Sequence, residues 1–348
     1  MLIQENVALA PLTTLRVGGP ARYFAQAHTI AEVSEAVSLA RSRNLALFVL
    51  GGGSNLVISD AGWPGLVLKI SIPDIEERSR DDKSLFEVGA GEDWDKFVAY
   101  AVSRNCAGIE CLSGIPGSVG GTPVQNVGAY GQEVAETIES VLTLDLRDGQ
   151  VRELCNEACR FQYRTSIFNT SERGRYIILR VTYALTPGDE PAILYADLKK
   201  YFTGRSTQPT LAETREAVRQ IRASKAMLIT PDDEDSRSAG SFFKNPVLSD
   251  EQYKELSNRA AAKGLQIPSY PALQAQRKIS AAWLVERSGF SKGYGNGRVG
   301  ISRKHALAIV NRGDATATDI VALKEEIQRR VEEVWGLHLD AEPVFVGF

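Results

Sequence analysis

The stretch of this chain best suited to chemistry is a glycine-rich run at residues 113–131. It contains six glycines and two prolines among nineteen residues and carries no charged side chain. A solvated linker normally contains Lys, Glu, Asp or runs of Ser. Glycine lets the backbone approach a ligand closely, and successive backbone N–H groups of such a run can bind phosphate oxygens. The run therefore predicts a phosphate-binding loop, and a buried crossover between two elements is the alternative interpretation.

A second glycine-rich turn occupies residues 50–56, which read Leu-Gly-Gly-Gly-Ser-Asn-Leu. Two such turns in one chain favour a long ligand with a pyrophosphate in its middle. The turn does not fit a Rossmann fingerprint, which needs G-x-G-x-x-G at the start of a helix. Leu56 stands at the position of the third glycine, and residues 56–59 have the apolar character of a strand.

Basic side chains in two other segments could meet an anionic ligand. Arg164 lies in the aromatic segment 161–168, and an arginine buried there needs a partner, either a carboxylate or a ligand. A helix predicted over residues 210–225 carries basic residues toward its C-terminal end, at Arg219, Arg222 and Lys225. Interaction of these charges with the helix dipole is the alternative explanation.

The bulk composition describes an ordinary globular chain. With 348 residues, 43% hydrophobic and 24% charged, it predicts two or three domains. The formal net charge of −3 does not indicate the excess of basic residues that is typical of nucleic-acid-binding proteins. Glu5 interrupts any signal-peptide pattern, and no apolar run approaches the ~20 residues of a membrane span. We therefore expect a cytoplasmic protein with no nucleic-acid or membrane partner.

The cysteines and histidines do not form a metal-binding pattern. The spacings C-x4-C and C-x3-C differ from zinc-binding spacings, and the three histidines are scattered. The residues concerned are Cys106, Cys111, Cys155, Cys159, His28, His305 and His338. We expect no metal, and free thiols in a reducing compartment.

Periodicity and turn signals predict the elements that must position these residues. Capping boxes open two helices, with Thr29 and Glu32 beginning the first and Thr210 and Glu213 beginning the second. The predicted helices are 29–43, 92–104, 210–225, 250–263, 280–288 and 316–335. The predicted strands are 22–27, 45–50, 56–59, 66–70, 85–88, 140–145, 151–154, 176–185 and 306–310, with a hairpin turn at Asp148-Gly149. Residues 187–210 are predicted to be a connector, and residues 231–238 a charged loop.

Six segments together resemble the UDP-N-acetylenolpyruvoylglucosamine reductase family. They occur in family order and span nearly the whole chain, and the Gly-Ser-Phe-Phe-Lys-Asn-Pro run at 240–246 is the most specific of them. The six segments are 14–19, 51–55, 113–131, 161–168, 239–246 and the tail around Glu342.

The resemblance implies a fold of the α+β or α/β class. It implies a two-subdomain FAD-binding domain of the vanillyl-alcohol-oxidase type and a C-terminal α+β domain for the substrate. The implied boundaries are 1–72 for the first FAD-binding subdomain, to which the tail 340–348 returns, 73–205 for the second, and 206–339 for the substrate domain. Residues 193–198 resemble the mobile tyrosine loop of the type I branch.

The resemblance also implies a reaction and its catalytic residues. NADPH reduces a non-covalently bound FAD, and hydride then passes from flavin N5 to C3 of the enolpyruvyl group of UDP-N-acetylglucosamine enolpyruvate. A proton reaches C2, and UDP-N-acetylmuramate results. Arg164 matches the arginine that stabilises the developing charge, Ser241 matches the proton donor, and Glu342 matches the glutamate that orients or polarises the substrate carboxylate.

The same resemblance implies further binding residues. We also expect the protein to be a monomer. Those expected to contact substrate or the NADPH phosphates are Tyr163, Tyr195, Lys225, Asn245 and His305. Those expected to cradle the FAD pyrophosphate are Gly51, Gly52, Gly53, Ser54, Asn55, Gly114, Ile115, Pro116, Gly117 and Ser118. Those expected on the flavin side are Asn126, Gly128, Ala129 and Arg222.

Three departures from the enteric members of the family stand out. The stretch after Lys225 is longer and more acidic, Val344 replaces a basic residue, and His305 stands where Gln is common. Two alternative functions remain open: another flavin enzyme of the same fold, such as an alcohol oxidase, and a non-catalytic nucleotide-binding module. Some oxidases attach flavin through His or Cys, and Cys106 and Cys111 precede the long loop.

Overall fold

The computed structural model describes residues 1–231, 233–271, 276–295 and 297–348. The described chain forms two compact units, each of which draws on segments distant in the sequence. The first unit contains residues 1–7, 21–53 and 63–228. The second unit contains residues 8–20, 54–62 and 229–348. The units therefore divide the first 72 residues between them, whereas the sequence-based boundaries kept these residues together.

The first unit begins with a four-stranded sheet in the order β1-β2-β5-β3. Its strands are β1 (Ile3–Ala8), β2 (Pro20–Ala27), β3 (Leu47–Leu50) and β5 (Trp63–Ile70). β2 and β3 both pair with β5 in parallel, and α1 (Ile30–Ser42) starts at the predicted Thr29/Glu32 capping box. The predicted strands 22–27, 45–50 and 66–70 are confirmed. β1 is not among them, because its sequence Ile-Gln-Glu-Asn-Val-Ala has little apolar alternation.

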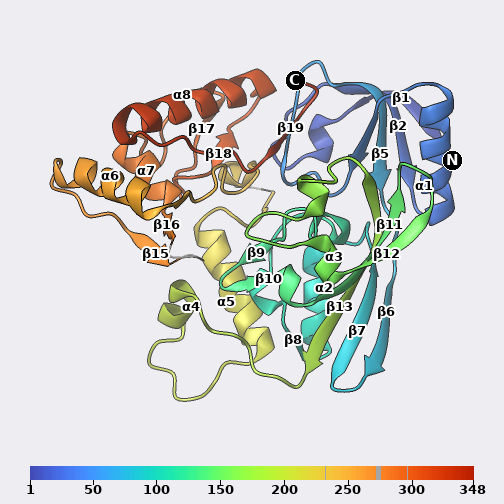
Figure 1. Cartoon of the computed structure of the whole chain (residues 1–348), viewed down its shortest axis with the longest axis horizontal. Helices are drawn as coiled ribbons and strands as arrows, with labels where there is room; N and C mark the ends of the chain where they lie inside the picture. Colours follow the sequence, from blue (N-terminus) through green and yellow to red (C-terminus); the bar gives the residue numbers. More distant parts are fainter. Residues whose placement is uncertain (232, 272–275, 296) are drawn as a thin grey trace. The chain divides into compact units, whose positions relative to one another are not determined.

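A second sheet in this unit is antiparallel, in the order β12-β11-β13-β7-β6, with β8 paired to β13 (Figure 1). Its strands are β6 (Ile75–Arg80), β7 (Lys83–Gly89), β8 (Cys106–Ala107), β11 (Ile138–Asp145), β12 (Val151–Cys155) and β13 (Tyr176–Pro187). The hairpin predicted at Asp148-Gly149 joins β11 to β12 as expected. β6 was missed, since four of its six side chains are charged.

Helix α2 (Trp94–Ser103) packs its apolar stripe into the core of the first unit, as its spacing predicted. Asp93 caps the helix by accepting a hydrogen bond from the Lys96 N–H, 2.9 Å away. Trp94 and Phe97 are almost fully buried, and their rings meet edge to face at 5.8 Å. The first turn of α2 is therefore held rigidly against the core.

Helix α5 (Leu211–Ser224) starts at the predicted Thr210/Glu213 capping box. The remaining elements of the first unit are short. These short elements are β9 (Gly128–Ala129), β10 (Gln132–Glu133), α3 (Asn156–Cys159), α4 (Ala196–Tyr201) and the 3-10 turns Glu110–Leu112, Val119–Gly121, Val134–Glu136 and Ile167–Asn169. The predicted connector 187–210 is thus interrupted by α4. Its six residues are too few for a periodic signal.

Among its described residues, the second unit packs helices against short strand pairs (Figure 1). Its helices are α6 (Asp250–Ala261), α7 (Ala281–Arg287) and α8 (Ala317–Trp335), with 3-10 turns at Ala10–Leu12 and Glu234–Ser236. Its strands are β4 (Leu56–Ile58), β14 (Val247–Leu248), β15 (Ser269–Pro271), β16 (Arg277–Ile279), β17 (Val299–Ile301), β18 (Ile309–Asn311) and β19 (Val344–Val346). The strand predicted at 306–310 begins only at Ile309, because the preceding residues form a turn.

Distant segments are joined tightly inside the second unit. β19 pairs in parallel with β4, so the C-terminal tail lies beside residues 56–58. The Asp60 carboxylate accepts hydrogen bonds from the N–H groups of Ala317 and Thr318, 2.7 and 2.9 Å away, and so caps α8.

The predicted charged loop at residues 231–238 is partly buried, and Asp232 within it lies outside the described residues. Asp235 and Ser236 are buried there, and Glu234–Ser236 form a 3-10 turn. Buried polar groups of this kind require hydrogen-bond partners, which only the folded chain supplies. No helix in the described ranges is long and apolar enough to cross a membrane.

Candidate functional site

The two glycine-rich turns predicted to bind pyrophosphate come together in the first unit. A Cβ added to Gly52 would lie 2.5 Å from the Cα of Gly117, and one added to Gly51 would lie 2.9 Å from the Ser118 Oγ. Gly53 and Gly117 have φ of +68° and +134°, which L side chains rarely adopt. Gly52 is therefore required by backbone contact, and Gly53 and Gly117 by conformation, and at these positions no side chain keeps a ligand away.

The long loop is fastened to the first turn of α2. Gly117 O accepts a hydrogen bond from the Trp94 N–H at 3.1 Å, and Leu112 O accepts one from the buried Trp94 indole N–H at 3.0 Å. The Gly114 N–H donates to the Asp95 carboxylate at 2.5 Å. The Gly114 N–H is thus already used, and Pro116 has no N–H. Backbone N–H donors for an anion must therefore come from other loop residues, such as Ile115, Gly117 and Ser118.

Asp95 connects this loop to helix α5. Its carboxylate accepts two hydrogen bonds from Arg215, at 2.6 and 3.0 Å, and one from Arg219 at 2.5 Å. Burial by itself would raise the pKa of the Asp95 carboxyl, but the hydrogen bonds from Arg215 and Gly114 outweigh it and hold that pKa below its usual value. Asp95 and Arg215 were not found by sequence reasoning, because their interaction spans 120 positions.

Arg222 places a positive charge beside the same loop. Its guanidinium donates to Gly114 O at 3.1 Å and to Met227 O at 2.7 Å. Burial lowers the pKa of this guanidinium, but arginine remains charged in proteins. A guanidinium suits an anionic ligand because it forms charge-assisted hydrogen bonds, although Tyr130 and the Asp95 carboxylate also act on its charge.

These features fit a dinucleotide such as FAD. Two turns without side chains at five glycine positions let a pyrophosphate approach the backbone, and the cation of Arg222 lies at their edge. The five positions are Gly51, Gly52, Gly53, Gly114 and Gly117.

Arg164 lies at the tip of a tight turn in the first unit. Gln162 and Thr165 exchange two backbone hydrogen bonds of 3.0 Å, and Arg164 has a φ of +57°. Its Nη2 donates to Gly128 O at 2.8 Å, and its guanidinium carbon lies 5.3 Å from the centre of the Tyr163 ring. One partner of Arg164 is thus a backbone carbonyl of β9, whereas the sequence led us to expect a carboxylate or a ligand.

Asn126 holds the Arg164 turn against the glycine-rich run. It is buried, and its amide nitrogen donates to Gln162 O at 3.1 Å and to the Glu133 carboxylate at 2.7 Å. Its amide oxygen accepts from the Ala135 N–H at 3.1 Å. The side chain of Asn126 is therefore committed to positioning Gly128 and Ala129, which follow it, and the turn that carries Arg164.

Tyr195, Lys225 and Tyr130 form a third cluster in the first unit. Tyr195 precedes α4, is 47% exposed, and meets the Tyr130 ring edge to face at 5.5 Å. Lys225 pairs with Asp197 at 2.5 Å and lies 6.0 Å from the Tyr130 ring centre. Two predicted substrate residues are thus brought together by Tyr130, which sequence reasoning did not single out.

Ser241 is held firmly in the second unit. The next residue, Phe242, is fully buried, donates its N–H to Leu307 O at 2.8 Å and accepts the Glu342 N–H at 2.9 Å. Gly240 has a φ of +77°, which allows the chain to turn into this segment. The Ser241 Oγ lies 3.2 Å from His305 Nε2. Ser241, His305 and the backbone of Glu342 are therefore neighbours, although they are far apart in sequence.

Asn55 and Asn245 both stabilise backbone in this unit. The Asn55 amide donates to Glu342 O at 3.2 Å, and Asn55 O accepts the Val344 N–H at 2.9 Å. Asn245 Oδ1 accepts the Ala281 N–H at 2.9 Å and so caps α7. Ser54 O, next to Asn55, accepts the Thr14 hydroxyl at 3.3 Å. Of these predicted ligand-contact residues, Asn55 thus also anchors the tail that carries Glu342.

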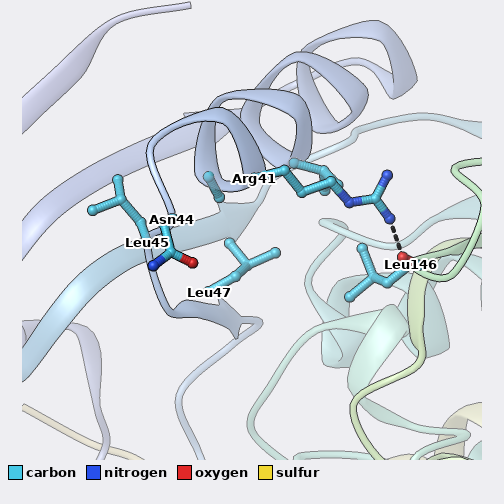
Figure 2. Close-up of a pocket in the computed structure, with 7 residues that line it drawn as sticks. Arg41, Asn44, Leu45, Leu47 and Leu146 are labelled. Carbon is cyan, nitrogen blue, oxygen red and sulfur yellow. Dashed lines mark hydrogen bonds between the residues drawn. The ribbon is translucent and has the colours of Figure 1, made fainter.

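A cavity of about 340 Å³ lies away from the predicted residues (Figure 2). Arg41 reaches across it to donate a hydrogen bond to Leu146 O. Its lining residues are Val37, Ala40, Arg41, Asn44, Leu45, Leu47 and Leu146, and no predicted site residue is among them. In the part of the chain that the structure describes, no cluster of His, Cys, Asp and Glu could hold a metal.

Comparison with known proteins decides the family. A model described as "UDP-N-acetylenolpyruvoylglucosamine reductase, C-terminal domain" matches residues 231–346, and a model described as "FAD binding domain" matches residues 21–154. The UDP-N-acetylenolpyruvoylglucosamine reductase of Streptomyces coelicolor is 45% identical, covering 99% of this chain and 91% of that relative. The chain belongs to the UDP-N-acetylenolpyruvoylglucosamine reductase family. The protein of the same name from Thermobifida fusca is 44% identical, covering 99% of this chain and 98% of the relative.

A solved structure agrees with this family assignment. The UDP-N-acetylenolpyruvylglucosamine reductase of Thermus caldophilus superposes with a TM-score of 0.66 at 28% identity, covering 99% of this chain and all of that one. The predicted resemblance and the predicted fold class are confirmed: an FAD-binding domain of the vanillyl-alcohol-oxidase type precedes the family's C-terminal domain. As a reductase of this family, the chain is a flavoprotein oxidoreductase of peptidoglycan precursor synthesis.

Proposed function

We propose that this chain reduces UDP-N-acetylglucosamine enolpyruvate to UDP-N-acetylmuramate with NADPH, and that it belongs to the type I branch. The observation that carries the proposal is the fixed position of Ser241, whose neighbour Phe242 is hydrogen-bonded to both the Leu307 and Glu342 segments. A proton donor must be held in place before the reaction, and this backbone arrangement does so. The proposed setting is cytoplasmic, and the proposed state is a monomer.

FAD, when bound, supplies the hydride-transfer chemistry between NADPH and the substrate. The residues that would hold its pyrophosphate are the glycine turns 51–53 and 114–118, and Arg222 adds a positive charge at Gly114. Ser54 and Asn55 continue the first turn. Asn126 orients Gly128 and Ala129, which we assign to the flavin side together with Arg222. The attachment is non-covalent in this proposal.

Arg164 is assigned to the charge that develops on the substrate. Addition of hydride at C3 of an enolpyruvyl group moves negative charge onto C2 and its carboxylate. A guanidinium opposite that carboxylate stabilises the charge where it forms, through parallel hydrogen bonds that a lysine cannot reproduce. The Gly128 carbonyl and the Tyr163 ring hold the Arg164 side chain ready for this role.

Ser241 and Glu342 are assigned to the proton and to the orientation of the carboxylate. An alcohol is a weak acid, but C2 becomes a strongly basic centre, so Ser241 can donate to it. Glu342 orients or polarises the substrate carboxylate. Tyr163, Tyr195, Lys225, Asn245 and His305 are assigned to the substrate or to the NADPH phosphates. The Lys225–Asp197 pair would keep Lys225 close to Tyr195.

Anaerobic stopped-flow absorbance of the purified holoprotein tests the function. NADPH is added first and UDP-N-acetylglucosamine enolpyruvate second. We expect the flavin band to bleach with NADPH and to return only with the sugar nucleotide. Bleaching without any response to the sugar nucleotide would overturn the proposed substrate and would favour another flavin oxidoreductase of this fold.

Two substitutions test the residue assignments in the same instrument. Ser241→Ala should leave the NADPH half-reaction nearly unchanged and slow the second half-reaction by about 10²–10⁴-fold. Equal loss in both half-reactions would contradict the assignment of Ser241 as proton donor. Arg164→Lys should impair the second half-reaction far more than FAD content, and loss of FAD instead would make Arg164 a structural residue.

A further inference from the structure

Two residues of the second unit are linked through a series of hydrogen bonds. The Nε2 atom of His305 lies 3.2 Å from the Ser241 Oγ. The acidic segment 231–238 contains Asp235, which is only 4% exposed. Both residues belong to the second unit, and hydrogen bonds through residues 302–304 connect them.

Asp235 fixes the turn that carries His305. Its Oδ2 accepts hydrogen bonds from the Ser302 hydroxyl at 3.1 Å and from the Arg303 N–H at 2.7 Å. The Ser302 Oγ in turn accepts the N–H groups of Lys304 and His305, at 3.0 and 3.2 Å. A buried carboxylate thus organises four consecutive residues, and the last of them is His305.

The acidic segment is itself held in place. Asp233 Oδ1 accepts the Asp235 N–H at 3.1 Å, and Asp233 Oδ2 pairs with the Lys304 ammonium at 2.6 Å. The Ser236 hydroxyl donates to Asp233 O at 2.7 Å and to Thr230 O at 3.0 Å. Two connections therefore join the acidic segment to the turn, one through Asp235 and one through Lys304.

We propose that His305 is a catalytic residue which resupplies the Ser241 proton, and that Asp235 is a positioning residue which holds His305 in place. The inference rests on the proposed function. Histidine titrates close to neutral pH, whereas a serine alkoxide is very costly to form. A histidine within hydrogen-bond distance of the Ser241 hydroxyl removes that cost.

The Ser241 O–H bond breaks as a C–H bond forms at C2 of the substrate. The His305 imidazolium gives its Nε2 proton to the Ser241 oxygen in the same step, so no free alkoxide forms. The neutral imidazole is then reprotonated by hydronium or a buffer acid, so the reaction consumes one proton from the solvent. Two protons move in the rate-determining step, whereas Ser241 alone would move one.

A proton inventory on the second half-reaction distinguishes these two cases. Its rate is measured in mixtures of H₂O and D₂O, in the holoenzyme reduced beforehand with NADPH. For the natural protein we expect a curved dependence on the deuterium fraction. For His305→Gln, which keeps hydrogen bonding but cannot pass on a proton, we expect a linear dependence and a rate lower by about 100-fold. A linear dependence in the natural protein, or equal curvature in His305→Gln, would overturn the inference.

Variants at Asp235 test positioning separately. Asp235→Asn keeps an oxygen acceptor for Ser302, so its rate and its dependence on the deuterium fraction should stay close to those of the natural protein. Asp235→Ala should slow the second half-reaction and make its rate depend linearly on the deuterium fraction. Equal effects of the two substitutions would contradict the positioning role. His338→Gln is the matched control, because His338 is an exposed histidine bonded to Gln328. It should change neither the rate nor the inventory.

Ring-nitrogen NMR of the ¹⁵N-histidine holoprotein gives a readout that does not depend on turnover. Ser241→Ala should shift the Nε2 resonance of His305 and leave that of His338 unchanged. An unchanged His305 resonance would contradict the hydrogen bond on which the inference depends. If the natural protein reacts with NADPH but not with the sugar nucleotide, the proposed function fails. If it turns over and His305→Gln matches it, only this inference fails.

Discussion

The carboxylate of Asp95 and the guanidinium of Arg215 form a two-point ion pair, with N–O distances of 2.6 and 3.0 Å. The same carboxylate accepts the Gly114 N–H at 2.5 Å. One side chain at the start of α2 therefore connects helix α5 to the loop proposed to hold the FAD pyrophosphate. Because neither glycine-rich turn contains a charged side chain, the charges of Asp95 and Arg222 that contact the long loop come from outside it.

Asp95→Asn should weaken FAD binding and lower the free energy of unfolding by about 1–3 kcal/mol, because Arg215 and Arg219 lose their shared carboxylate. The measurements are the flavin-to-protein absorbance ratio after gel filtration and chemical denaturation of the apoprotein. Glu77→Gln serves as control, since it breaks a surface pair with Arg104 and should change little. If Asp95→Asn retains full FAD content, the carboxylate does not organise the loop.

Acidification should reveal the same interaction. The pKa of Asp95 is lower in the folded protein than its usual value near 3.8, so its ionised form stabilises the fold fully above that value. This contribution is lost as pH falls below 3.8 toward the lowered pKa. The difference in unfolding free energy between the natural protein and Asp95→Asn should be constant from pH 7 to about 4 and shrink below that. A difference that grows on acidification would contradict the assignment.

Gly52→Ala should weaken FAD binding by about 10-fold or more. The added Cβ would lie 2.5 Å from the Gly117 Cα, and backbone cannot yield as a flexible side chain does. Overpacking of this kind costs about 1–3 kcal/mol. Gly121→Ala is the matched control in the same region, because its Cβ would meet only the Ser118 Oγ at 3.9 Å. Fluorescence titration of the apoproteins with FAD measures both, and equal affinities would refute the predicted clash.

The four cysteines should differ sharply in reactivity toward iodoacetamide. Cys155 is exposed, whereas burial raises the pKa values of the Cys106 and Cys111 thiols and raises that of Cys159 to about 12. Only the thiolate reacts, so Cys155 alone should be alkylated in the native protein at pH 8. Mass spectrometry of peptides checks this, with the urea-unfolded chain as the control that labels at all four positions. Rapid labelling of Cys111 would show that its burial is incomplete.

Local sequence was sufficient for the elements with strong signals of their own. The capping boxes at Thr29 and Thr210 begin α1 and α5 where predicted, because a cap depends only on residues three positions apart. The Trp94/Phe97 stripe was correctly assigned to the core for the same reason. β6 and α4 were missed: β6 has charged residues where alternation is sought, and α4 is too short for a periodic pattern.

The family was also predicted from the sequence, through six ordered segments that resemble it, and the catalytic roles assigned to residues in those segments stay predictions. What the sequence could not indicate was how those residues are held. The Asp95–Arg215 pair, the Ser241–His305 contact and the support of His305 by Asp235 join positions that are 120, 64 and about 70 residues apart. The sequence did not indicate the burial of Asp235 in the predicted charged loop, because its partners Ser302 and Arg303 lie 67 and 68 positions away.

The sequence by itself determined the types of group available: two uncharged glycine turns, a guanidinium, a serine and a glutamate in family order. Tertiary structure decided which of them touch. Gly52 needs glycine because the Gly117 backbone meets it there, and Gly117 needs glycine because its φ is +134°. Asp235 is buried because Ser302 and Arg303 supply its hydrogen bonds. Contacts of this range depend on the packing of the whole unit, whereas caps and periodicity depend on neighbours along the chain.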